Sequence, residues 1–525
     1  MRPLIAFALL TAVVAPVQAQ TTPKVEEASI ADLRAMMAKG VSSEAITRAY
    51  LARIAAMDRK GPTLRSVIAV NPDAIAQAQA ADARRKAGKP IGPLDGIPIL
   101  VKDNIETKDP VATTAGSLAL KDNVTGRDAP VVAELRSAGA VILGKTNLSE
   151  WANIRSNNSI SGWSAVGGQV RNPYALDRTP CGSSSGTGAS IAASFAAAGL
   201  GTETDGSVVC PSSINGLAGL KPTIGLVSRT HVVPISHSQD TPGPMARSVR
   251  DVAVLFSSMI APDPADPATK DAAAHRRDYA RSLSWASLKG VRVAVLRPRM
   301  GDDLKAAFEA ALAVLKAQGA VLVDVEAPKS DGLGEAEFAV LLSELKGDLN
   351  TYLATTPPAV KTRTLADVIA FNEANKAVEM PFFGQETFIA AEATRGLDDP
   401  EYLGARAKSL RLAGKEGIDA MLAKANATIL VEPSYGPGWL IEPVYGDQYQ
   451  GPSSSELPAV SGYPNLTVPM GLVKGLPVGL SFIGTAYSEQ KLLEAGYVYE
   501  QASHKRVPPR YLPSADVGPG MDGAR

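Results

Sequence analysis

The chain has 525 residues, of which 45% are hydrophobic and 20% are charged, so it can bury a large core. Lysine plus arginine and aspartate plus glutamate both total 53, which leaves no formal net charge. No basic or acidic run stands out, and this argues against nucleic acid as a partner.

The N-terminus has the pattern of a secretory signal peptide. Arg2 supplies a positive start, the segment from Leu4 to Val14 is apolar, and Val17-Gln18-Ala19 is a small-residue cleavage site before Gln20. The apolar run is too short to span a bilayer as a mature helix, and no other stretch is long enough. We expect removal of residues 1–19 and a periplasmic or secreted mature protein, with a retained N-terminal anchor as the alternative.

The first part of the mature chain predicts helices followed by a short buried strand. Apolar residues recur at helical spacing over 30–37 and 44–56. Asn71-Pro72 predicts the start of a third helix that runs to Arg85, with Asn as the cap and Pro in the first turn. The apolar run 97–101 predicts a strand that delivers Lys102 at its C-terminal end, where α/β sheets tend to carry their chemistry.

A phosphate-loop pattern follows, but its setting does not suit a nucleotide. Residues 129–137 predict a helix and 140–143 a buried strand, and Gly139 to Thr146 fit the phosphate-loop spacing. Such a loop needs an exposed Gly-rich bend, whereas Ala-Val-Ile-Leu predicts a strand. We therefore do not expect nucleotide binding.

The stretch from Arg178 to Thr223 is poor in charge and rich in Gly, Ser and Ala. Two serine loops, Gly182–Gly186 and Asp205–Ser207, flank a small-residue run from Ala189 to Ala198 that predicts a helix. Small side chains let backbone N–H groups approach a reacting oxygen. Each loop alone is typical of an ordinary turn. Two such loops, joined by one helix and a short strand, would meet at one sheet edge and favour a reactive site.

The remainder of the chain continues an α/β pattern. A turn-rich region extends to Pro244, a helix is expected over 251–259, and 262–284 are expected to loop over the surface. The further expected strands are 291–296, 320–325, 427–431, 466–470 and 478–483, and the further expected helices are 303–318, 335–353, 365–379 and 401–424. We interpret residues 20–525 as one α/β domain, with 285–430 as a helical elaboration.

These motifs, in this order, resemble the amidase signature family. The two serine loops are similar to the family's Gly-Gly-Ser-Ser-Gly-Gly and Gly-Gly-Ser segments, and Gly92 to Asn104 is similar to its lysine segment. Gly144–Asn153 and Gly219–Thr223 fit as well. The resemblance spans most of the chain after residue 24. It implies a large mixed β-sheet core covered by helices on both faces.

Four positions depart from the family's usual pattern. Cys181, Ser185 and Asp205 stand where the family usually has Gly, and Val209 stands where Arg is common. These changes resemble the bacterial peptide amidase branch, whose members release ammonia from C-terminally amidated peptides. The resemblance therefore implies a serine amidohydrolase of this type that works through an acyl-enzyme intermediate.

The resemblance also implies roles for particular residues. Ser207 would be the nucleophile, Ser183 a proton relay preceded by a cis peptide bond, and Lys102 the base. Lys102 must be neutral to accept a proton, so burial must lower its pKa from about 10.4. The expected substrate contacts are the oxyanion-hole N–H groups of Thr204, Asp205, Gly206 and Ser207, and Asn153, for which structural capping is the alternative. The Asp205 side chain could position the amide nitrogen or brace the loop.

Several rival interpretations compete with the triad. Ser184 is central in a segment that fits the nucleophile elbow of α/β-hydrolases, but this needs one of only four histidines, His231, His237, His275 and His504. Ser343-Glu-Leu-Lys346 fits the Ser-x-x-Lys pattern of penicillin-binding enzymes, without apparent partners. The resemblance also leaves open an aryl- or fatty-acyl-amide hydrolase, a tRNA amidotransferase subunit (which an export signal disfavours) and an inactive binding protein on this fold.

The two cysteines, Cys181 and Cys210, are not expected to hold a metal, because no His accompanies them at ligand spacing. A disulfide and two buried thiols remain equally open. No cofactor or metal is implied. The expected partner is a small carboxamide substrate, with no nucleic acid and no membrane after signal cleavage.

Overall fold

Eleven strands form one mixed sheet in the computed structural model of the chain, which describes residues 22–515. The predicted signal peptide lies outside these residues. In spatial order the strands are β1 (Val67–Val70), β3 (Val141–Thr146), β2 (Pro98–Lys102), β4 (Ala198–Glu203), β6 (Thr241–Ala246), β5 (Ala218–Lys221), β10 (Asn465–Val473), β11 (Leu476–Ile483), β9 (Ile429–Pro433), β7 (Arg292–Leu296) and β8 (Val321–Val325). The predicted mixed α/β architecture is confirmed.

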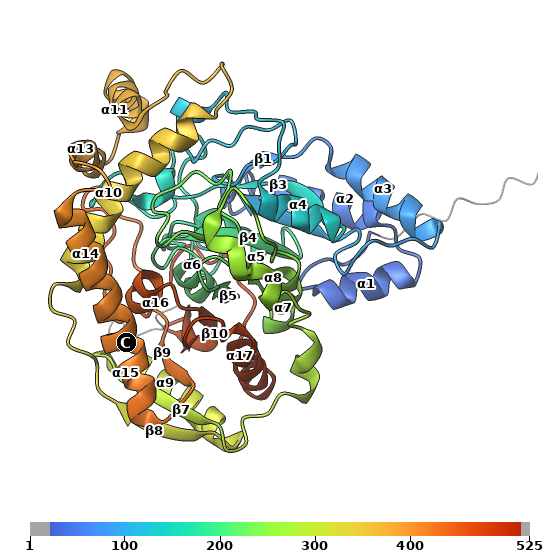
Figure 1. Ribbon diagram of the computed structural model, residues 1–525. Coiled ribbons are helices and arrows are strands. Elements are labelled where there is room, and N and C mark those ends of the chain that lie inside the picture. Colours follow the sequence, from blue (N-terminus) through green and yellow to red (C-terminus); the bar gives the residue numbers. More distant parts are fainter. Residues whose placement is uncertain (1–21, 516–525) are drawn as a thin grey trace, which may run out of the picture.

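Helices surround this sheet (Figure 1). They are α1 (Ile30–Ala38), α2 (Ser43–Met57), α3 (Ala74–Lys86), α4 (Pro130–Ser137), α5 (Ser185–Ala192), α6 (Val209–Ile214), α7 (Val249–Ser257), α8 (Ala272–His275), α9 (Asp302–Ala317), α10 (Leu333–Ala354), α11 (Leu365–Ala374), α12 (Lys376–Glu379), α13 (Glu386–Glu392), α14 (Pro400–Leu410), α15 (Asp419–Ala425), α16 (Glu456–Ser461) and α17 (Glu489–Ser503). A π-helical stretch, Arg411–Ile418, joins α14 to α15. Within residues 22–515, no helix is long and apolar enough to cross a membrane.

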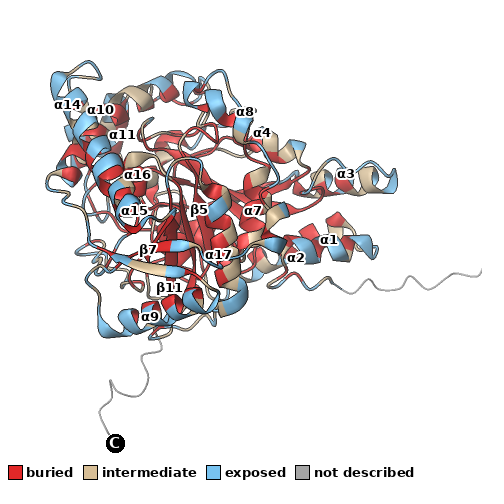
Figure 2. Ribbon diagram, turned by 60° about the horizontal axis from the view of Figure 1, so that its bottom comes forward, coloured by how far each residue is buried: buried red, intermediate tan, exposed pale blue. Residues whose placement is uncertain are grey.

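Strand β7 shows that both faces of the sheet are covered. Val293 and Val295 belong to the core that also contains Phe308 of α9. Ala294 and Leu296 alternate with them and belong to a second cluster, which contains Met421, Leu422 and Ala425 of α15. Successive strand residues face opposite sides of a sheet, so α9 and α15 lie on opposite faces. Figure 2 shows most of the sheet as buried, apart from its β7–β8 edge, and the outward helix faces as exposed.

Three neighbouring strands position the candidate site. β2 lies between β3 and β4 and is parallel to both, with Val101 opposite Leu200 of β4. The C-terminal ends of parallel neighbours meet at the same sheet edge. Lys102, the last residue of β2, is therefore beside the loop that follows β4.

Helices α10, α11 and α13 contribute to a separate apolar cluster next to this edge. Leu345 and Leu349 of α10 pack with Phe388 of α13. The Phe388 ring meets Trp151 edge-on, with ring centroids 5.8 Å apart. Residues 285–430, which we predicted as a helical elaboration, also supply β7 and β8 to the main sheet.

Some predicted boundaries were wrong. The expected helix 189–198 is instead α5, which begins at Ser185 and ends at Ala192, and Ala198 already belongs to β4. The helix expected to be capped by Asn71 starts at Ala74, because the Asn71 side chain donates to the Ile142 carbonyl and accepts from the Asp73 N–H.

The turn-rich region before residue 244 hides β5 and β6. Two prolines in β6, Pro242 and Pro244, argue against a central strand. The strand tolerates them because β5 pairs only with Met245 and Ala246, beyond both prolines.

Candidate active site

The Lys102 side chain ends in a network of oxygen atoms. It is fully buried, and its Nζ lies 2.7 Å from Ser183 Oγ and 2.8 Å from Thr202 Oγ1. The Thr202 carbonyl oxygen is 3.3 Å from the same Nζ, and Asn104 Nδ2 donates to Thr202 Oγ1 at 3.0 Å. In the neutral amine, two N–H bonds can thus point at Thr202, which leaves the lone pair for the Ser183 hydroxyl.

Burial lowers the pKa of Lys102, as a neutral lysine base requires. Desolvation lowers the pKa of Lys102 to about 7, against the negative charges of Asp240 and Glu203, which raise it. At neutral pH a large fraction of this amine is therefore uncharged. The burial that a neutral Lys102 requires is present.

Ser183 lies on the loop before α5, and the peptide bond from Gly182 to Ser183 is cis, as the resemblance implied. A Cβ atom at Gly182 would clash with the Ser149 hydroxyl and would lie 2.9 Å from Ser161 Oγ, so only glycine fits. The Ser149 N–H donates to the Ser183 carbonyl at 3.0 Å. These contacts fix the direction in which the Ser183 hydroxyl points.

Ser207 follows β4 and precedes α6. The Ser184 N–H donates to the Ser207 carbonyl oxygen at 3.2 Å, which fastens the two serine loops together. Ser207 is 7% exposed, whereas Ser183 is 1% exposed, so Ser207 is the more accessible of the two. The structure therefore places the Lys102 and Ser183 side chains in contact and the Ser207 loop beside them.

The loop that ends at Ser207 has backbone N–H groups without hydrogen-bond acceptors in the described chain. Within residues 22–515, the N–H groups of Asp205, Gly206 and Ser207 donate no hydrogen bond. Gly206 has φ of +75°, and a Cβ there would clash with the Tyr435 hydroxyl. Free N–H groups on a glycine-containing loop are what an oxyanion hole requires.

Two carboxylates that sequence reasoning missed hold this loop from behind. Glu203 accepts from the N–H groups of Val208 and Val209 at 2.7 and 2.9 Å, and it thereby caps the start of α6. Asp240 Oδ1 accepts from the Thr204 hydroxyl at 2.5 Å. Glu203 could have been predicted, because it lies within the small-residue stretch. Asp240 could not, because it is 36 residues from Thr204 and belongs to no local motif.

Asn153 lies at the margin of the site. Its Nδ2 donates to Ser161 Oγ at 3.4 Å, and this hydroxyl in turn borders Gly182. Ser149 and Ile154, not Asn153, cap the 3-10 turn Glu150–Asn153. The Asn153 Oδ1 atom is buried without a hydrogen-bond partner in the described chain. A positioning contact to substrate is compatible with this geometry.

Asp205 also keeps one carboxylate oxygen unpaired. Within the described residues its Oδ1 is buried and accepts no hydrogen bond. Burial raises its pKa, while a hydrogen bond from Ser455 and the positive charge of Lys221 lower it. The unpaired Oδ1 remains available to a ligand.

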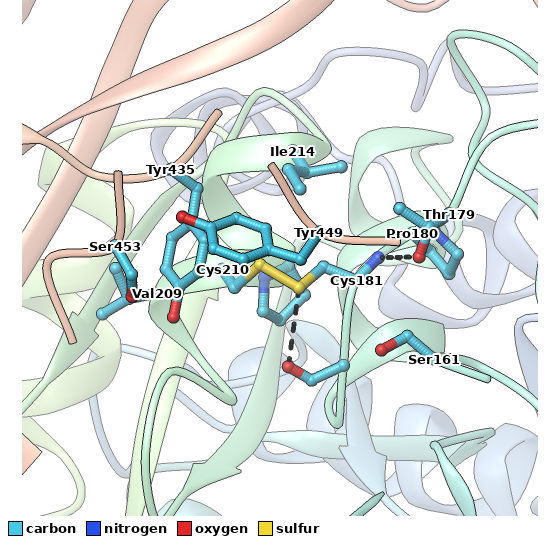
Figure 3. The surroundings of a disulfide bond; sticks show 12 residues. Ser161, Thr179, Pro180, Cys181, Val209, Cys210, Ile214, Tyr435, Tyr449 and Ser453 are labelled. Carbon is cyan, nitrogen blue, oxygen red and sulfur yellow. Dashed lines mark hydrogen bonds between the residues drawn. A yellow bond between two sulfur atoms is a disulfide. The ribbon is translucent and has the colours of Figure 1, made fainter. Parts of the chain in front are cut away.

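A disulfide joins the residue before the first serine loop to α6, which follows the second serine loop (Figure 3). Cys181, directly before Gly182, is bonded to Cys210 in α6, at a sequence separation of 29. The pair packs against Val209, Ile214 and Tyr435. Of the two interpretations that the sequence left open, the structure has the disulfide.

The serine hydroxyls of the competing motifs form hydrogen bonds with the backbone. The Ser184 hydroxyl donates to the Thr202 carbonyl at 3.0 Å and accepts from the Thr202 N–H at 3.2 Å. In the Ser-x-x-Lys segment, Ser343 donates to the Ala339 carbonyl and Lys346 donates to the Glu392 carbonyl. Neither the Ser184 nor the Ser343 hydroxyl bonds to a basic side chain within the described residues.

The phosphate-loop pattern likewise has a structural explanation. Lys145 is buried within β3, where its Nζ donates to Thr113 Oγ1 at 2.8 Å and pairs with Asp103 at 3.1 Å. The strand predicted over 140–143 is present as β3, so this pattern is not an exposed Gly-rich bend.

Known proteins match almost the whole chain. A protein-family model described as amidase matches residues 45–493. A probable amidase of Arabidopsis thaliana is 38% identical over 508 residues, which cover 94% of each chain. The native peptide amidase of Stenotrophomonas maltophilia superposes with a TM-score of 0.87 at 50% identity, covering 92% of this chain and 99% of that one. A peptide amidase in complex with the competitive inhibitor chymostatin superposes with a TM-score of 0.89 at 51% identity, with the same coverage.

Proposed function

This chain belongs to the amidase signature family and is an amidase that acts on linear amide bonds, and from that premise we propose that it releases ammonia from C-terminally amidated peptides. We assign the catalysis to Ser207, Ser183 and Lys102. The observation that carries this assignment is the buried Lys102 amine, 2.7 Å from Ser183 Oγ, in a loop that is bonded to Ser207.

The first half-reaction forms an acyl-enzyme. Neutral Lys102 takes a proton from Ser183, which takes the proton of Ser207 as its oxygen attacks the amide carbonyl carbon. The N–H groups of the loop 204–207 stabilise the oxyanion that develops. The proton returns along the same path to the nitrogen, so the C–N bond breaks and ammonia leaves.

The second half-reaction reverses the roles. Water replaces ammonia, gives its proton through Ser183 to Lys102, and attacks the ester formed on Ser207. Collapse of this intermediate returns the proton to Ser207 and releases the free carboxylate. No metal or cofactor takes part in this scheme.

The choice of peptide amides rests on the similarity to solved peptide amidases at 50–51% identity. Since NH₂ is the whole leaving group, the rest of the substrate lies on the acyl side. A closed wall behind the nitrogen would exclude any chain that continues past the scissile bond. Such steric exclusion discriminates more strongly than one methylene of apolar contact, worth about 1–3 kcal/mol.

We expect short peptide amides to be deamidated without internal cleavage. After incubation, mass spectrometry should show a gain of about one mass unit, because –NH₂ becomes –OH. A panel of peptide, aryl and fatty amides, compared by ammonia release, provides the control. Internal fragments would contradict the proposal, and preference for a fatty or aryl amide over every peptide amide would move the protein to another branch.

We further propose that the protein is exported, on the evidence of the N-terminal pattern and the Cys181–Cys210 disulfide, which suits an oxidising compartment. Expressed with its native N-terminus in a Gram-negative host, the protein should be recovered from the periplasm or medium. Its N-terminal sequence should begin at Gln20, and both cysteines should resist alkylation until reduced. Recovery from the cytoplasm with Met1 retained would contradict export.

A further inference from the structure

The buried carboxylate of Asp240 is fully engaged behind the catalytic loop. Besides the Thr204 hydroxyl on its Oδ1, its Oδ2 accepts from the N–H groups of Ile235 and Ser236 at 2.8 and 3.0 Å. Asp240 is 8% exposed and directly precedes β6, whereas Thr204 directly follows β4. The hydrogen bond between them therefore ties the loop that carries Ser207 to the neighbouring strand.

The support behind Asp240 is itself anchored. Glu344 of α10 accepts from the Ser238 N–H at 3.0 Å and from the hydroxyls of Ser236, Ser238 and Tyr402. Asp348, one turn further along α10, accepts from the His237 N–H at 2.8 Å. Because residues 235–240 are fixed to a long helix, Asp240 can transmit that rigidity to Thr204.

Asp240 also acts on the base through its charge. Burial raises the pKa of Asp240 to about 6, while hydrogen bonds from Thr204, Ile235 and Ser236 lower it, so the group is ionised at neutral pH. The charged groups that face Lys102 are Asp240 and Glu203, with the Asp103–Lys145 pair beside them. The charged groups that face Asp240 are Lys102, Arg229 and Asp348.

We propose that Asp240 is a positioning residue of the amidase site, which holds the oxyanion loop through Thr204 and favours the protonated form of Lys102 by its negative charge. This proposal rests on the roles that we assign to Ser207 and Lys102. It separates two effects, one geometric and one electrostatic, which different substitutions can remove.

Asp240→Asn removes the charge and leaves one acceptor oxygen for three donors. We expect kcat to fall about 10–100-fold with a smaller change in KM, since loop misplacement costs rates of this order. Without the negative charge, the pKa of Lys102 falls further, so the acid limb of kcat/KM should move to lower pH by about one unit. Thr204→Val removes the hydroxyl but keeps the Asp240 carboxylate, so kcat should fall while the acid limb moves less than in Asp240→Asn.

Asp251→Asn is the matched control. Asp251 is also buried and its carboxylate accepts from the Ile30 N–H at 3.2 Å, and its pKa is also raised to about 6 by burial. This variant should lower the melting temperature but leave kcat per folded molecule and the acid limb unchanged.

Three outcomes would overturn the proposal. The first is an Asp240→Asn variant whose kcat and acid limb equal those of the wild type. The second is a loss of activity in Asp240→Asn that is fully explained by the unfolded fraction in a thermal melt. The third is a shift of the acid limb in Thr204→Val as large as that in Asp240→Asn. Failure of the underlying function has a different signature, because Ser207→Ala or Lys102→Ala would then remain active whatever Asp240 does.

Discussion

Ser207→Ala is expected to abolish ammonia release, by roughly 10⁵-fold or more in kcat, because members of a catalytic triad act as a unit and no other group can take the acyl moiety. The Ser207 side chain is 7% exposed, and its loop is held by neighbours that the substitution leaves in place. The variant should therefore remain folded. Ammonia release from a peptide amide, together with a thermal melt, checks both statements.

The controls for this variant come from the elbow interpretation. Ser184→Ala should retain substantial activity, because the Ser184 hydroxyl is bonded to the Thr202 backbone. Each single His→Ala variant should do the same. A histidine variant that is folded and inactive, or an active Ser207→Ala, would refute the assignment of Ser207.

Lys102→Ala is expected to lose about 10²–10⁴-fold in kcat without unfolding, since general acid–base catalysis contributes this much and serves both half-reactions. Lys102→Arg should be no better, because a guanidinium cannot be deprotonated in a protein. Lys221→Met is the matched control. It removes another buried lysine, with a pKa lowered to about 8, whose Nζ donates to the Pro458 carbonyl instead of a serine.

The pH dependence follows from the same lysine. Lys102 is an effective base only above its pKa of about 7, so the wild-type rate should be half-maximal near that pH. Two units lower, only about 1% of the amine is neutral, and kcat/KM should be about 100-fold lower. Initial rates from pH 4 to 9, with circular dichroism to verify folding, measure this limb. A flat profile would exclude a neutral-lysine base.

The sequence predicted the fold where periodicity was strong. The helices from Ile30 and Leu365 start at the expected residues, and the strand before Lys102 was found because a short apolar run ends in one charged residue. β6 was missed because its prolines and glycine have the composition of a turn, and only tertiary pairing with β4 makes it a strand. The end of α5 was misjudged because Ala is compatible with both helix and the buried strand that follows.

The residues of the candidate site also fall into those that the sequence predicted and those that it did not. Lys102, Ser183 and Ser207 could be identified from the sequence because each stands in a local motif. In the structure, Lys102 contacts Ser183, and the two serine loops are hydrogen-bonded to each other. Thr202 and Asp240 were not assigned, since their contribution depends on contacts across the sheet edge. Local sequence therefore singles out the groups to which we assign the reaction, and long-range packing supplies the neighbours that would orient them.

The Cys181–Cys210 bond makes a covalent ring out of the segment that holds both serines, α5 and β4. Closing a ring of this size removes about 3–4 kcal/mol of chain entropy from the denatured ensemble. Lys102 lies 81 residues before Ser183 and is outside the ring. When the chain unfolds with its disulfide intact, Ser183 and Ser207 stay within one covalent ring. Lys102 has no such covalent constraint, so unfolding separates Lys102 from Ser183 without a limit set by the disulfide.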